Sequence, residues 1–204
     1  MNRVELKNQA KKVLTGKVFI LFLIMFVPSL IISLASYTGW GAVVTILVSG
    51  SLEYALSLIF LNVLRKNTEP KFEELLAGFK DNNFGRTLEA FVRMMVFTFL
   101  WSLLFVIPGI IKAISYSQMF YLMADDKKLS AADAQKQSMA MMEGHKMDYF
   151  VLSLSFILWA ILCGITFGLA FIYVGPYMQL TYTAFYDKLK GTGSHAKAKE
   201  AKLA

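Results

Sequence analysis

Three long apolar blocks, separated by charged stretches, dominate the pattern of hydrophobic and polar positions along the chain. They cover residues 18–64, 94–124 and 149–186. A membrane-spanning helix needs about 20 apolar residues, with a range of about 17 to 25. The first block is too long for one such helix and divides at YTGWG, residues 37–41, and the third divides near GITFG, residues 164–168. The pattern therefore predicts an all-α, polytopic transmembrane helical bundle.

The middle block is interrupted in its interior by Pro108 and Gly109. Proline lacks the helical N–H donor, and glycine tolerates the backbone conformations of a tight reversal. We therefore predict a hairpin tip at these two residues. Its arms, 94–107 and 109–124, are short for a full crossing, so the pair either crosses as short helices or is re-entrant. The alternative is one long kinked helix, which gives five crossings in place of six.

The distribution of charge favours the hairpin. Of the 21 Lys and Arg residues, all except Lys112 lie in four segments that flank the apolar blocks, and these segments hold every acidic residue except Glu53. Basic residues of short loops stay in the cytoplasm. All four segments share one side of the membrane only if the middle block enters and returns. The charges thus predict three hairpins with both termini in the cytoplasm.

The predicted organisation is a single membrane domain, residues 1–189, followed by a disordered basic cytoplasmic tail, residues 190–204. The six segments are predicted at about residues 18–38, 42–64, 90–107, 109–124, 149–165 and 168–187. The N-terminal basic region and the first apolar segment are both longer than those of a signal peptide, so we expect the first segment to remain uncleaved.

One of the cytoplasmic connectors is amphipathic. In PKFEELLAGFK the apolar residues follow i, i+3, i+4, i+7 spacing, which predicts an α-helix with one apolar face. The face consists of Phe72, Leu75, Leu76 and Phe79. It is predicted either as a connector at the membrane interface or as a docking face for a partner.

Glu53 and Lys112 are the two charges inside the apolar blocks. At 1.5 Å per residue, Glu53 lies about 18 Å from the inner boundary at Arg65, and Lys112 about 20 Å from Asp125. An unpaired charge near the bilayer centre costs about 2.5 to 3.5 kcal/mol. Either the two pair as an intramembrane polar site, or Lys112 extends toward water along the hairpin tip. In the second case Glu53 is protonated or lies in a small polar pocket.

The candidate chemistry is sparse. A net charge of +7 suits nucleic acid, but the cations are confined to segments beside the apolar blocks, so we expect no nucleic-acid partner. The single cysteine, Cys163, excludes a disulfide within the chain and a cysteine-rich zinc site. The sequence has no HExxH, no GxSxG and no phosphate-binding glycine loop. We therefore expect no catalytic residues, no metal site and no cofactor.

Several phrases of the sequence resemble a known family in their order. They are FEELLAGFK, LWSLLFVIPGIIKAISYSQMFYLMADD, LSAADAQKQSMAMMEGHK, FVLSLSFILWAIL and VGPYMQLTYTAFYDKL. The chain is similar over about residues 3–189 to the bacterial integral-membrane family called domain of unknown function 975. The resemblance implies a multi-pass protein of the bacterial plasma membrane. It implies no enzymatic activity and no catalytic residues.

Two classes of function remain. The first is a non-catalytic membrane component, such as an accessory subunit, a scaffold, or an envelope-stress or immunity factor. The second is a protein that binds or transports a lipid or another amphipathic solute through the Glu53/Lys112 region. The expected partners are membrane lipids and either a membrane protein or a second copy of the chain.

Overall fold

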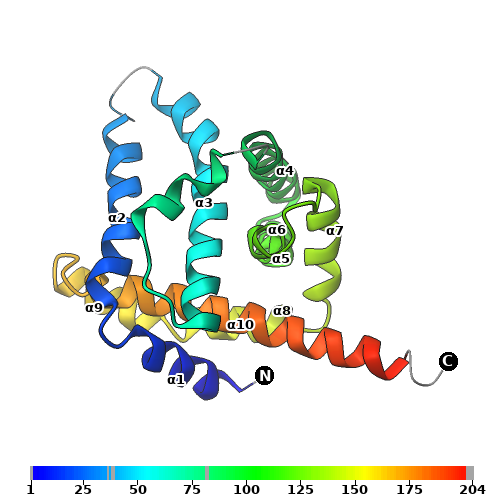
Figure 1. Cartoon of the computed structure of the whole chain (residues 1–204). Helices are drawn as coiled ribbons and strands as arrows, with labels where there is room; N and C mark the ends of the chain where they lie inside the picture. Colours follow the sequence, from blue (N-terminus) through cyan, green and yellow to red (C-terminus); the bar gives the residue numbers. More distant parts are fainter. Residues whose placement is uncertain (1, 36, 38–39, 81–82, 201–204) are drawn as a thin grey trace.

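The part of the chain that the structure describes is helical and contains no strand, which confirms the all-α prediction. The computed structural model describes residues 2–35, 37, 40–80 and 83–200 (Figure 1). Its elements are α1 (Arg3–Leu14), α2 (Val18–Ala35), α3 (Gly41–Lys66), the 3-10 helix η1 (Phe72–Gly78), α4 (Asn83–Leu104), α5 (Val106–Tyr116), α6 (Met119–Asp125), α7 (Ala131–Met141), α8 (Lys146–Leu154), α9 (Ile157–Ile165) and α10 (Phe171–Glu200).

The long helices form three hairpins that point in different directions. In Figure 1, α2 and α3 run up the picture, α8, α9 and α10 run across it, and α4 and α5 are seen nearly end-on. Helix α3 lies between the hairpins and contacts α2, α4, α6 and α10. The arrangement therefore differs from the expected bundle, in which six helices run side by side.

Two stretches of the described chain are long and apolar enough to cross a membrane. They are α3 and the stretch Lys146–Ile165, which comprises α8 and α9. Helices α1 and α2 add a third if they are counted as one span, although the chain bends by 96° between them. By length and composition, two or three crossings are thus supported.

Burial divides each hairpin into two parts. The buried side chains are concentrated toward the charged ends of the helices, above all on α3, α6 and α10, and we call this part the base. Toward the reversals the side chains are mostly exposed and apolar, and we call these parts the first tip (25–49), the second tip (95–114) and the third tip (157–173). The hydrophobic core of the protein therefore lies in the base, where the three hairpins meet.

Helix α1 is part of the base. The side-chain oxygen of Asn2 caps it by accepting hydrogen bonds from the backbone N–H groups of Val4 and Glu5 at 3.1 and 3.5 Å. Its apolar stripe, Leu6, Ala10 and Leu14, is buried, and α1 packs on α10. This stripe has i, i+4, i+8 spacing, so it forms one continuous face of the helix.

Helix α10 runs through Glu200, whereas the sequence predicts a disordered tail from residue 190. The alanine- and lysine-rich stretch AKAKE, residues 196–200, has high intrinsic helix propensity, which favours continuation of the helix. Residues 201–204 of the predicted tail lie outside the described residues.

Glycine lets α3 and α4 approach closely. A Cβ atom at Gly50 would lie 2.3 Å from the carbonyl oxygen of Thr87 on α4, whereas a Cβ at Gly85 would meet nothing within 4 Å. Beside this contact the hydroxyls of Ser51 and Thr87 lie 3.0 Å apart. The crossing of α3 and α4 in the base thus depends on the missing side chain at Gly50.

We predict opposite effects for alanine at these two helical glycines. Gly50→Ala should destabilise the protein by about 1 to 3 kcal/mol because it overpacks the crossing. Gly85→Ala should be neutral or stabilising, by up to about 1 kcal/mol, because alanine has the higher helix propensity. Thermal unfolding in detergent and abundance in the membrane measure both. Equal behaviour of the two variants would contradict the close approach at Gly50.

Candidate functional site

The most connected polar site of the base joins the ends of α3 and α6 to the middle of α10. Asp125, at the end of α6, accepts hydrogen bonds from two guanidinium nitrogens of Arg65 on α3 at 2.5 and 3.0 Å. It also accepts from the Tyr186 hydroxyl at 2.7 Å and the Lys190 ammonium at 2.6 Å, both on α10. Arg65 donates its remaining Nε–H to Asp187 at 2.6 Å. We call these five residues the charge cluster.

The electrostatics of the charge cluster centre on Asp125, whose side chain is only 12% exposed. Burial opposes its ionisation, but hydrogen bonds from Arg65, Lys190 and Tyr186 outweigh burial and hold the pKa of the Asp125 carboxyl below its ordinary value. Bidentate pairing with arginine is among the stronger arrangements for a carboxylate. Asp125 is thus an ionised acceptor at neutral pH that holds α3 and α10 together.

Three further contacts join the charged segments of the base. Arg86 donates to the backbone carbonyls of Asp126 and Leu129, each at 3.0 Å. The buried Lys17 donates to the carbonyl of Asn67 at 2.7 Å, which ties the start of α2 to the end of α3. The C-terminal charged segment contacts the N-terminal one through the ion pair of Lys188 with Glu5. Sequence reasoning missed these partners, although it found the segments that carry them.

Glu53 and Lys112 form no ion pair in the described part of the chain. The ammonium of Lys112 lies 4.7 Å from the ring centroid of Trp101, across the α4–α5 hairpin. Glu53 forms no hydrogen bond among the described residues and is the one exposed side chain between Gly50 and Leu64. The structure therefore gives Lys112 an aromatic partner in place of the carboxylate that the sequence suggested.

The chain reverses at Phe105, three residues before the predicted tip at Pro108 and Gly109. Phe105 is extended, with φ −157° and ψ 145°, and α5 begins directly after it. Pro108 lies in the first turn of α5, where its missing N–H costs no hydrogen bond. Gly109 instead packs against Ser102 of α4, because a Cβ there would lie 2.1 Å from the Ser102 hydroxyl oxygen.

The connector was predicted to form an α-helix, and this prediction is wrong. Residues Phe72–Gly78 form a 3-10 helix, in which side chains three apart lie on one side. Leu75 and Gly78 are accordingly buried together. Phe72 is also three residues from Leu75, but it begins the helix and is exposed, as is Leu76. Phe79 stacks on Phe84 at 6.1 Å between ring centroids. Of the four predicted residues, Phe72 and Leu76 are thus exposed, Leu75 is buried and Phe79 is partly buried.

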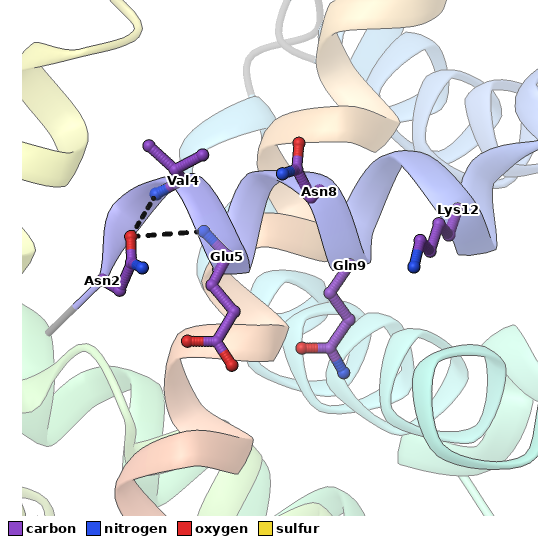
Figure 2. A pocket seen from close by; sticks show the side chains of 6 residues that line it. All are labelled: Asn2, Val4, Glu5, Asn8, Gln9 and Lys12. Carbon is purple, nitrogen blue, oxygen red and sulfur yellow. Dashed lines mark hydrogen bonds between the residues drawn. The ribbon is translucent and has the colours of Figure 1, made fainter.

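Two surface hollows complete the candidate sites of the described chain. The first is lined by α1 and its cap, through Asn2, Val4, Glu5, Asn8, Gln9 and Lys12 (Figure 2). The second is lined by one side of α4, through Glu89, Val92, Arg93, Val96 and Phe97. Each is a single helix surface with no second element opposite it. Neither encloses a ligand site, and the described residues include no cluster of metal-ligating side chains.

We predict that Asp125→Asn lowers the free energy of unfolding by about 2 kcal/mol, because charged hydrogen bonds in a mostly buried site are lost. Glu89→Gln, which removes an exposed i,i+4 pair with Arg93, should cost less than about 0.5 kcal/mol. Thermal or denaturant unfolding in detergent measures both losses. Equal losses for the two variants would contradict a central role for Asp125.

The same variant has a predicted pH dependence. Folding lowers the pKa of Asp125. The ionised carboxylate therefore contributes fully to the free energy of unfolding at pH values above the ordinary pKa of 3.8. This contribution is lost as the pH falls through the lower pKa of the folded state. The stability difference between the native protein and Asp125→Asn should therefore be constant near neutral pH and shrink in strong acid. If the stability difference between the native protein and Asp125→Asn instead grew on acidification, the lowered pKa of Asp125 would be contradicted.

The comparisons with known proteins agree with the resemblance noted from the sequence. The chain matches the family described as "Protein of unknown function (DUF975)" over residues 1–115 and 103–192. No curated protein and no solved structure matches it. The matched residues include all three hairpins and the charge cluster, so the chain belongs to the DUF975 family.

Proposed function

We propose that this protein is a non-catalytic integral membrane protein of the bacterial plasma membrane that serves as an accessory or scaffold component. In this proposal three apolar hairpins enter the membrane from the cytoplasm, and the base with both termini remains on the cytoplasmic side. The observation that carries it is the charge cluster, which joins the charged ends of α3 and α6 to the middle of α10. An accessory, envelope-stress or immunity role then acts through the base.

The contacts in the base favour this topology over five crossings. One crossing of the middle block would separate residues 65–93 from residues 125–148 by the thickness of the bilayer, about 30 Å of hydrocarbon. Arg65 instead bonds Asp125, and Arg86 bonds the carbonyls of Asp126 and Leu129. Both ends of the middle block are therefore expected on one side, which the positive-inside rule makes the cytoplasm.

Reporter fusions test this sidedness. A reporter that is active only in the cytoplasm, fused after Lys128 or after Lys190, should give signal at both positions because both follow an even number of membrane passages. A fusion after Tyr37, in the first reversal, is the control that should be silent. Signal at only one of the two cytoplasmic positions would revive the five-crossing arrangement.

The exposed part of the connector offers a surface for a protein partner. Phe72 and Leu76 are 43% and 53% exposed, although they lie in the base among charged segments. Apolar side chains exposed beside a polar surface favour protein–protein contact. A membrane-protein partner or a second copy of the chain is the expected occupant.

We predict that the double variant Phe72→Glu, Leu76→Glu loses a stoichiometric partner in purification from native membranes but keeps normal abundance. Val4→Glu, at an exposed apolar position of α1, is the control and should retain the partner. Leu75→Glu should instead lower abundance, because Leu75 is buried in the core. Retention of the partner by the double variant would remove this surface from the proposal.

A second candidate function is binding of a lipid or an amphipathic solute beside Glu53. The observation that favours it is the exposed side chain of Glu53 in an otherwise mostly buried stretch of α3, where it has no hydrogen-bond or ion-pair partner among the described residues. A defined lipid that co-purifies with the native protein but not with Glu53→Gln would favour this candidate over the accessory role.

A further inference from the structure

The third tip, residues 157–173, is the mostly exposed end of its hairpin. On the α10 arm the change is sharp, because Val174 is buried whereas Tyr173 is exposed. On the other arm Phe156 is buried and Ile157 is exposed, although α8 before them is buried only at Leu152. Helix α9 has no buried residue, and Phe167 at the reversal is 98% exposed. The third tip carries no charged side chain. An uncharged, apolar and uncovered hairpin end is suited to lipid.

Two lysines mark the level at which the third tip begins. The Lys7 ammonium lies 3.4 Å from the backbone carbonyl of Ser155 and 4.4 Å from the ring centroid of Phe156. The Lys11 ammonium lies 5.8 Å from the ring of Tyr177, on the opposite arm. Charged ammonium groups are costly in hydrocarbon and stay at the headgroup level. The membrane boundary on this hairpin therefore lies near Ser155, not near Lys146.

The length beyond that boundary is half of a crossing. Helix α9 has nine residues, which at 1.5 Å per residue extend about 13 Å. The hydrocarbon core is about 30 Å thick. Even if it stands upright, the third tip reaches only about the middle of the bilayer.

The reversal of the third tip is built for an environment without water. Every backbone N–H from Thr166 to Val174 has an acceptor within the same segment or in α9. Gly168 donates to the Cys163 carbonyl at 2.7 Å, and Ala170, which lacks a backbone acceptor, donates to the Thr166 hydroxyl at 3.1 Å. Unpaired backbone donors are excluded from hydrocarbon, whereas a turn in water can leave them to solvent.

We propose that the third hairpin is re-entrant: its tip binds the acyl chains of the cytoplasmic leaflet and ends near the bilayer midplane. This replaces the full crossings expected at residues 149–165 and 168–187, although the stretch Lys146–Ile165 is long and apolar enough to cross a membrane. The proposal rests on the proposed cytoplasmic position of the base. The occupant of this apolar surface is one leaflet of the membrane. The hairpin consequently adds area to that leaflet alone.

The native Cys163 lies near the end of α9 and is the only cysteine of the chain, so it reports the depth of the third tip without any substitution. A charged, membrane-impermeant maleimide is applied to intact cells and to inside-out membrane vesicles that contain the full-length protein. We expect protection from both sides, with labelling at least about tenfold slower than after denaturation in SDS, because only a hydrated thiolate reacts.

A second variant tests whether Cys163 is protected from the maleimide by lipid or by neighbouring protein. In the Cys163→Ser background, Phe167→Cys places the thiol at the fully exposed reversal and should be equally protected. Ala140→Cys on the exposed side of α7 is the cytoplasmic control and should label only in inside-out vesicles. Labelling of Cys163 or Phe167→Cys from either aqueous side would overturn the proposal. Labelling of Ala140→Cys from outside, with Cys163 still protected, would instead overturn the sidedness of the base.

Discussion

The fold depends on the need to satisfy the Asp125 carboxylate, a charge that is mostly removed from water at the junction of three helices. A partly buried carboxylate is stable only when it is paired and hydrogen-bonded. Arg65 supplies a bidentate partner from α3, and Tyr186 and Lys190 supply two more donors from α10. Because the donors come from segments far apart in the chain, their geometry sets where the hairpins meet.

The environment of the side chains changes with distance from this junction. The base combines buried aromatic and aliphatic side chains with paired charges, as a soluble domain does. Aromatic pairs such as Phe156 with Tyr177 and Tyr149 with Tyr182, at 5.6 and 5.2 Å, join the arms of the third hairpin there. Beyond them the tips expose mostly apolar side chains, although the two arms of the second tip pack on each other at Gly109 and Ser102. The base can hold its shape by its own contacts, whereas the tips need an apolar solvent.

The sequence predicted the helical class and the four charged segments that meet in the base. It could do so because apolar block length and charge placement are local properties of the chain. It misplaced the reversal of the middle hairpin, since Pro108 fits a first helical turn as well as a tip and the decisive contact is Gly109 on Ser102. It likewise missed the 3-10 form of η1, because α and 3-10 helices share the i, i+3 spacing.

The candidate site was less predictable than the fold, because partner choice is a tertiary property. Lys112 and Glu53 have similar expected depths, and from depth alone they look like a pair. The aromatic ring of Trp101 on the neighbouring arm instead lies 4.7 Å from the Lys112 ammonium and offers it a cation–π contact within its own hairpin. A pairing inside one hairpin requires less chain ordering than one between hairpins. Glu53 is thereby left without a hydrogen-bond or ion-pair partner among the described residues, and it is not a member of the charge cluster.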